Sequence, residues 1–362
     1  MKTLLFLFCL VIYLAFAISA ANKQPISLQM DCSKQSSTVA CSFVFTNNGK
    51  EDLYLLKRDT PIEGLFSPFI DVSLHGSEPI PYQGIIAYRL PPTKDDFVLL
   101  KVGESVSATV AITNVFNIDT DGLYNIRYSK PLEYLTVDDM ILESVDELKE
   151  LTVHESVYVS LEDTQLLVKP KEPEEPKLGH TVHIQDCATA NFVVETNEHI
   201  ADTMNVHKRL CSKIDVAKSK VRNGGAYSIW FGAYSPDRAT KVTETLDRIK
   251  TGLTDHTITY EDAYDSWPCA TYKAVTWTFR SYPVKPYTTV YLCRNYYRNP
   301  TYCYYSTYTK ERFIMNVWAQ ALGYTDYAAD YYSSCRKLAQ NDPDTAVTNS
   351  YNYGFFYCYA IR

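Results

Sequence analysis

A proline-rich, charged segment divides this chain into two stretches with different hydrophobic patterns. Residues 168–180, Val-Lys-Pro-Lys-Glu-Pro-Glu-Glu-Pro-Lys-Leu-Gly-His, place three prolines among lysines and glutamates. Proline restricts the backbone torsion φ and has no backbone N–H, so this composition favours an extended, semi-rigid linker. The sequence therefore predicts a domain over residues 21–165 and a second over residues 180–362, joined by a linker over residues 166–179.

Before the linker, short β-rich runs predict an all-β domain. Two of them, within residues 38–58, flank an Asn-Gly turn at Asn48-Gly49. Short strands at this spacing are typical of an Ig-like sandwich. Cys32 and Cys41 flank a short polar loop, and we expect them to form a disulfide. Further strands are expected at residues 69–74, 84–89, 97–102, 105–112, 123–128 and 156–161.

After the linker, the apolar residues recur with helical spacing from Ala190 to Ala217. His207 lies on this apolar stripe, which indicates a hydrogen-bonded core histidine and not a metal ligand. If this helix begins at Cys187, Cys211 lies about 36 Å along its axis, and the two cysteines cannot pair. With further helices and strands, this half is predicted to be α+β.

Other segments of the second half carry local signals. Residues 227–234 are predicted to form a buried strand or turn, and residues 288–293 a strand. Ser235-Pro236 and Asp342-Pro343 each predict a helix start, with an N-cap followed by proline at the first helical position. Between them, one apolar face predicts an amphipathic helix that ends near Gly323, and its residues are Ile314, Val317, Trp318, Ala321 and Leu322.

The N-terminus predicts a secretory signal peptide over residues 1–20, with Lys2, an apolar run and small residues for cleavage. A retained membrane anchor is the alternative, and no later segment predicts a membrane span. Ten cysteines include Cys9 of the leader, so nine remain. In an oxidising compartment most of them pair, and the odd one is free or links two copies in a disulfide-bonded dimer. The net charge of -7 disfavours nucleic acid and anionic membranes as partners.

Tyrosine is unusually frequent. The chain has thirty tyrosines, and seventeen of them lie between Tyr282 and Tyr359. A tyrosine ring offers apolar area and a hydroxyl, which suits recognition of a protein or peptide partner. The alternative is that the rings fill the core or pack over the N-terminal sandwich. The candidate binding residues flank Cys303 and are Tyr302, Tyr304, Tyr305 and Tyr308.

Several motifs in order resemble the deuterolysin and peptidyl-lysine metalloendopeptidase family, the aspzincins. The similar stretches lie within residues 180–359 and are Cys187, Trp230–Val242, Ile258–Tyr260, Val290–Tyr297 and Cys335–Phe356. The resemblance implies a zincin-like α+β domain with zinc as cofactor. It also implies that the first domain is similar to the removable pro-segment of some members, and that Cys269 and Cys293 form a disulfide.

In this family a His-Glu-x-x-His helix holds zinc, and its glutamate activates water. The resemblance places those three positions at Ile314, Met315 and Trp318. It places the third zinc ligand at Asp326 or Tyr327. The two acids of the lysine-specific substrate pocket correspond to Tyr351 and Gly354. Apart from the aspartate, these side chains provide neither zinc-binding nor catalytic groups, so the resemblance implies no catalytic residue and no bound zinc in this chain.

The other local cluster of metal-ligating residues comprises His180, His183, Asp186 and Cys187. Because it borders the linker, we interpret it as solvated. The sequence thus predicts a secreted, inactive homologue of a metalloendopeptidase, a pseudoprotease that binds a partner in a tyrosine-rich cleft. Two alternatives stay open: an active metalloendopeptidase with non-standard ligands, and an extracellular structural or matrix protein whose tyrosines provide cohesion or cross-links.

Overall fold

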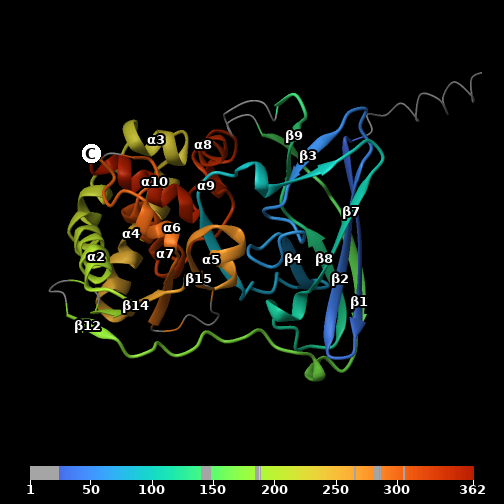
Figure 1. The fold of residues 1–362 in the computed structure, drawn as a ribbon, viewed down its shortest axis with the longest axis horizontal. Coiled ribbons are helices and arrows are strands. Elements are labelled where there is room, and N and C mark those ends of the chain that lie inside the picture. The colour runs from blue at the N-terminus through green and yellow to red at the C-terminus, as the bar shows by residue number, and fades with distance from the viewer. Residues whose placement is uncertain are drawn as a thin grey trace, which may run out of the picture.

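The fold was analysed in a computed structural model that describes residues 24–139, 148–183, 187, 189–264, 266–280, 285, 287–304 and 306–362. Figure 1 shows an all-β part at the right and a part rich in helices at the left. The expected signal peptide lies outside the described residues. Among the described helices, none combines the length and the apolar character needed to cross a bilayer.

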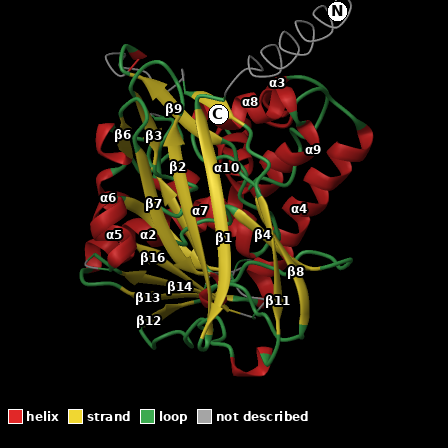
Figure 2. Ribbon diagram, turned by 90° about the vertical axis from the view of Figure 1, so that its right-hand side faces the viewer, coloured by secondary structure: helices red, strands yellow, loops and turns green. Residues whose placement is uncertain are grey.

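The N-terminal part contains three small antiparallel sheets, with strand orders β1-β2-β7, β10-β9-β3-β6 and β11-β8-β4. Figure 2 shows β1, β2 and β7 on the side that faces away from the helices. The strands are β1 Ile26–Gln35, β2 Thr38–Asn47, β3 Leu53–Leu56, β4 Ile70–Leu74, β6 Phe97–Leu100, β7 Ser105–Ala111, β8 Gly122–Tyr128, β9 Leu132–Thr136, β10 Lys149–Leu151 and β11 Ser156–Leu161.

Alternation of apolar side chains explains these strands, because one face is buried and the other is not. In β2 the residues from Val39 to Asn47 are buried at nearly every second position. The two runs around Asn48-Gly49 do form strands, but they do not pair with each other. Strand β2 pairs with β1 and β7, whereas β3 pairs with β6 and β9, so the turn carries the chain from one sheet to another.

The C-terminal part is built on a six-stranded sheet of order β12-β13-β14-β16-β15-β5. Its own strands are β12 His180–Val182, β13 Thr189–Val193, β14 Thr257–Asp262, β15 Ala274–Phe279 and β16 Tyr287–Leu292. Strand β5, Ile85–Arg89, comes from the N-terminal half and pairs antiparallel with β15 at the end of the sheet. The expected boundary between two independent domains is therefore crossed by one strand.

Helices cover this sheet, and their order is α2 Asn197–Lys218, α3 Gly225–Phe231, α4 Pro236–Asp255, α5 Trp267–Tyr272, α6 Arg294–Arg298, α7 Lys310–Ala321, α8 Tyr332–Asn341, α9 Pro343–Ala346 and α10 Ser350–Ala360. Ser235 and Asp342 are N-caps followed by proline, as the sequence indicated. The segment expected as a buried strand or turn is instead helix α3, which buries Tyr227, Trp230 and Phe231.

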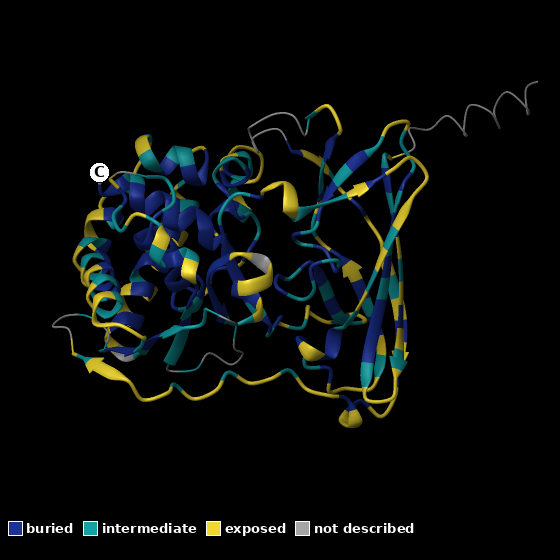
Figure 3. Cartoon of the chain, viewed as in Figure 1, coloured by how far each residue is buried: buried dark blue, intermediate teal, exposed yellow. Residues whose placement is uncertain are grey.

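The first long helix begins later than predicted. Residues 189–193 form strand β13, and Thr196 caps α2 by accepting a hydrogen bond from the His199 N–H. The linker is extended and exposed over much of its length, and it runs along the bottom edge of the molecule in Figures 1 and 3. Figure 3 also shows that the helices at the centre of the C-terminal part, α7 and α10, are almost wholly buried.

Candidate functional site: helix α7 and its surroundings

Helix α7 lies in the core of the C-terminal part, and it is the helix that the sequence resemblance assigns to the zinc site. Thr309 caps it by accepting a hydrogen bond from the Arg312 N–H. Ile314 and Trp318 are 0% exposed and Met315 is 1% exposed. The Trp318 ring packs edge-on against the buried His207 ring, with centroids 4.9 Å apart. These three side chains pack in the core and provide no nitrogen or oxygen donor suited to zinc.

The first turn of α7 carries buried charges. Glu311 is fully buried, forms an ion pair with Arg209 at 2.8 Å and accepts a hydrogen bond from the Cys303 N–H at 2.8 Å. Burial raises the pKa of its carboxyl group, while these partners favour the charged form. Burial lowers the pKa of Arg312, whose guanidinium lies 4.4 Å from the centroids of the Tyr308 and Phe355 rings. These contacts anchor the helix without forming a catalytic pair.

The resemblance assigns the third zinc ligand to Asp326 or Tyr327, and both side chains have other partners in the structure. Asp326 is half exposed and forms an ion pair with Arg280 at 2.6 Å. Tyr327 is 4% exposed, and its ring packs edge-on against Tyr351. One exposed aspartate that already pairs with arginine does not make a zinc site. The described residues around α7 therefore do not fit the family's metal.

The two substrate-pocket positions lie on α10, packed against α7. Tyr351 is 0% exposed. A Cβ added at Gly354 would lie 1.8 Å from Asn316 Oδ1 and 3.0 Å from the Arg312 carbonyl oxygen. Only glycine lets the two helices approach this closely, so a glutamate at residue 354 would force them apart. The site that would hold an acidic pocket is instead closed by helix packing.

Strand β5 fills the remaining space beside these positions. The Tyr88 ring packs against the Tyr351 ring in a tilted arrangement with a centroid distance of 5.2 Å, and its hydroxyl donates to the Asn316 carbonyl oxygen at 3.4 Å. The Arg89 N–H donates to the Tyr351 hydroxyl oxygen at 3.1 Å. The sequence predicted a strand at β5 but not its place beside α7 and α10, because the residues of a strand do not indicate which distant elements it packs against.

The tyrosine-rich segment lies elsewhere. The Arg209 guanidinium of α2 packs over the rings of Tyr302 and Tyr304, at 5.2 Å and 4.7 Å from their centroids. Tyr304 is 49% exposed, whereas Tyr308 is half-buried and accepts a hydrogen bond from the Tyr332 N–H. Tyr305 lies outside the described residues. The tyrosine rings of Tyr88, Tyr327 and Tyr351 lie at the contact between the two halves.

Eight described cysteines form four disulfides: Cys32–Cys41, Cys187–Cys211, Cys269–Cys293 and Cys303–Cys358. The first pair is the one expected from the sequence and the third is the one implied by the family resemblance, but the expectation that Cys187 cannot reach Cys211 was wrong. Strand β13 lies between Cys187 and α2 in the chain, so Cys187 is not part of the helix. The chain before β13 can therefore lie beside α2, where Cys187 meets Cys211. Cys335 is the odd thiol, and it is fully buried, so it offers no surface sulfur for a disulfide-linked dimer.

His207 is a core histidine, with its Nδ1 2.8 Å from the Tyr260 hydroxyl and its Nε2 3.2 Å from Cys187 Sγ. With Cys211 it completes the one group of three metal-ligating side chains found among the described residues. The two sulfurs are bonded to each other, and a disulfide lacks the thiolates that bind metal. His180 and His183 are exposed, as expected for the linker edge, and Asp186 lies outside the described residues.

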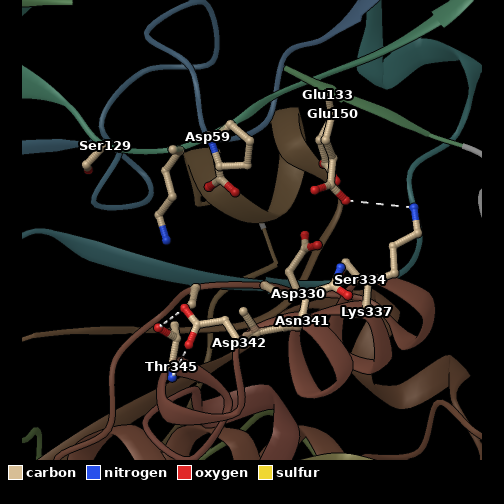
Figure 4. Close-up of a pocket in the computed structure, with 15 residues that line it drawn as sticks. Asp59, Ser129, Glu133, Glu150, Asp330, Ser334, Lys337, Asn341, Asp342 and Thr345 are labelled. Atoms are coloured by element: carbon tan, nitrogen blue, oxygen red, sulfur yellow. Dashed lines mark hydrogen bonds and ion pairs between the residues drawn. The ribbon is translucent and has the colours of Figure 1, made fainter. Parts of the chain in front are cut away.

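A pocket of about 370 Å³ lies where the two halves meet (Figure 4). Asp330 is buried and pairs with Arg58 at 3.3 Å, and the Tyr331 hydroxyl donates to Glu133 at 2.7 Å. Burial raises the pKa of Glu133 to about 8. Residues from both halves line this pocket. The sequence predicted a tyrosine-rich cleft between the halves, but no tyrosine is among the residues that line this pocket.

Comparison with known proteins agrees with the motifs. Residues 216–358 match the model of the family described as lysine-specific metallo-endopeptidase, Aspzincin_M35. A protein of Aeromonas hydrophila named "Extracellular protease" is 26% identical over 326 residues, which are 88% of this chain and 87% of that protein. A solved zinc peptidase from Grifola frondosa aligns with 45% of this chain and 96% of its own, at 19% identity and a TM-score of 0.38. Through residues 216–358, the C-terminal part of this chain is similar to the aspzincin family of lysine-specific metallo-endopeptidases.

Proposed function

We propose that this chain is a secreted member of the metalloendopeptidase family that has lost zinc-dependent hydrolysis and acts by binding. The observation that carries the proposal is the state of α7. Its three motif positions hold Ile314, Met315 and Trp318, and each of these side chains is at most 1% exposed. A metallopeptidase needs histidine or carboxylate ligands and an open position for water, and the three motif positions of this helix offer neither.

Three further observations support secretion. The N-terminus has the pattern of a signal peptide, and the chain contains four disulfides, which persist in oxidising compartments. The A. hydrophila relative is named an extracellular protease. Expression with the native leader, followed by N-terminal sequencing of the secreted product, tests this part of the proposal. Finding the protein in the cell fraction with an intact leader would contradict it.

The proposal of lost hydrolysis is tested by metal analysis and a protease assay. The purified chain is dialysed against zinc-free buffer and measured by mass spectrometry of metals, and then incubated with casein and a lysine-containing peptide. We expect well under one zinc per chain and no cleavage above the buffer control. One tightly held zinc per chain together with cleavage would overturn the proposal.

The alternative of an active enzyme with other ligands has one observation in its favour. Cys187, His207 and Cys211 place their ligand atoms within 4.8 Å of one another, and His207 contacts Trp318 on α7. These sulfurs bind metal only after the disulfide is reduced. Zinc that appears only after treatment with a thiol reductant, together with reductant-dependent cleavage, would favour this alternative.

For the binding activity, the exposed part of the tyrosine-rich segment is the proposed contact surface. Tyr304 presents a half-exposed ring held by Arg209, which suits contact with a peptide. In a screen against a peptide library, Tyr304→Ser should reduce binding of the selected peptides. Tyr158→Ser is the matched control, because Tyr158 is 56% exposed on β11. Equal effects of the two substitutions would remove this surface from the proposal.

A further inference from the structure

Strand β5 lies on the sheet of the C-terminal part in the way that a bound peptide lies on a sheet edge. It pairs antiparallel with β15, with Ile86 opposite Thr278 and Ala87 opposite Trp277. The sheet ends at β5, so the strand is the last one added. Peptide recognition by strand addition uses this arrangement, in which main-chain hydrogen bonds hold the segment and side-chain pockets select it.

The Tyr88 side chain of β5 packs against helices α7 and α10, whereas the Arg89 guanidinium pairs with Glu63 of its own half. Tyr88 is 0% exposed, packs against the Tyr351 ring and donates a hydrogen bond to the Asn316 carbonyl oxygen of α7. Arg89 is buried too, and its backbone N–H donates to the Tyr351 hydroxyl. A buried aromatic ring between two helices is the type of anchor that contributes most of the binding energy in protein interfaces.

Further contacts around β5 also join the N-terminal half to the C-terminal half. Arg58 pairs with the buried Asp330, and the Lys130 ammonium donates to the Tyr327 carbonyl oxygen at 2.5 Å. The Phe66 and Trp267 rings lie 4.5 Å apart. No described disulfide joins the two halves, because Cys32–Cys41 lies before the linker and the other three lie after it. The association is therefore non-covalent apart from the linker.

We propose that the edge of β15, together with the surface of α7 and α10 beside Tyr351, is an acceptor site for an extended segment carrying a tyrosine, and that β5 occupies it permanently in cis. The N-terminal half is then a built-in ligand of the C-terminal half and not a removable pro-segment. A partner has to bind elsewhere on the surface, or displace β5. This inference goes beyond the proposed function and holds whether or not the chain retains any hydrolytic activity.

The test uses the full chain with a protease recognition sequence inserted in the exposed linker after Glu172. After cleavage, the two pieces are followed by size-exclusion chromatography at decreasing concentration. We expect them to elute together, with the backbone amides of residues 85–89 and 274–279 still protected from hydrogen exchange. Separation of the cut wild-type chain at micromolar concentration, with loss of that protection, would overturn the proposal.

Tyr88→Ala tests the pocket, and Tyr158→Ala is the control at an exposed tyrosine of the same half. Loss of the buried anchor should weaken association of the cut pieces at least about 30-fold, as for a hot-spot residue, and the control should leave it unchanged. Equal behaviour of the two variants would refute the role of the pocket. If the uncut Tyr88→Ala chain does not fold, Tyr351→Phe serves instead, since it removes only the hydroxyl that accepts the Arg89 N–H.

Addition in trans gives an independent measurement. A synthetic peptide of residues 84–90, Gly-Ile-Ile-Ala-Tyr-Arg-Leu, is added to the cut Tyr88→Ala chain. We expect it to restore exchange protection at residues 274–279, whereas the same peptide with alanine in place of tyrosine should not. Restoration by both peptides, or by neither, would contradict an acceptor site that selects the tyrosine.

Discussion

Replacing Ile314 and Trp318 by histidine and Met315 by glutamate would introduce the His-Glu-x-x-His pattern into α7. If this helix is a metal site that merely lost its ligands, the triple variant should bind zinc and remain folded. If the helix has become core, the new polar groups enter a space without room, water or partners. The burial of the three native side chains, at 0%, 1% and 0% exposed, favours the second outcome.

Two contributions determine how much unfolding free energy the triple variant should lose. Truncating a buried tryptophan costs about 3–5 kcal/mol and truncating a buried isoleucine or methionine about 2–5 kcal/mol, although histidine and glutamate recover part of the packing. Each buried polar group without a partner adds about 1–3 kcal/mol. Because the three sites are neighbours, the terms do not add fully, and we expect a total loss of about 5–10 kcal/mol. That loss is comparable with the whole unfolding free energy of a typical domain, about 5–15 kcal/mol.

The assay is urea unfolding followed by far-ultraviolet circular dichroism, with and without zinc. The matched control carries the same motif on the exposed face of α4, as Thr240→His, Lys241→Glu and Glu244→His, which have the same spacing. The control should unfold close to wild type, within roughly 0.5 kcal/mol per surface substitution. A variant in α7 that unfolds at the wild-type midpoint and binds one zinc per chain would refute the conclusion that α7 has become core.

Two further outcomes follow from buried titratable groups. Burial raises the pKa of the Cys335 thiol well above its ordinary value, so a chain without the leader should expose no thiol to Ellman's reagent at pH 8 until guanidinium unfolds it. Rapid labelling of one thiol in the folded chain would contradict this. Burial raises the pKa of Glu133 to about 8 from 4.5, so the folded state retains a proton that the unfolded state loses, and stability should fall as pH rises through this range. Glu133→Gln should reduce that decline in urea titrations from pH 5 to 8, whereas the exposed control Glu155→Gln should not.

Much of the secondary structure followed from local signals. The caps at Ser235 and Asp342 place their helices correctly, because a cap and a following proline act over one turn of chain. The apolar face of residues 314–322 identified a buried helix in the same way. The sequence also revealed the residue types at the positions that the resemblance assigns to the zinc site, since residue type can be compared without a structure.

Other features could not be read from the sequence. The segment that forms α3 was predicted to be a strand or turn. Helix α10 is buried on every side, so its sequence shows no helical period of apolar residues. The length of the helix after Cys187 was misjudged because residues 189–193 form a strand, which is what brings Cys187 to Cys211. A strand pattern states which face of a strand is buried, but it does not state which sheet the strand joins.

The place of β5 is the clearest case. Its β-rich composition predicted a strand at residues 84–89, yet its partner β15 lies about 190 residues further along the chain. Pairing over such a separation depends on the complete shape of both surfaces, here the pocket formed by Tyr351 and Asn316 for Tyr88. The sequence by itself determined that Ile314, Met315 and Trp318 stand where the family resemblance places the zinc-binding motif. Only the tertiary structure decided what fills the space beside that helix, because the filling residues come from the other half of the chain and leave no local pattern.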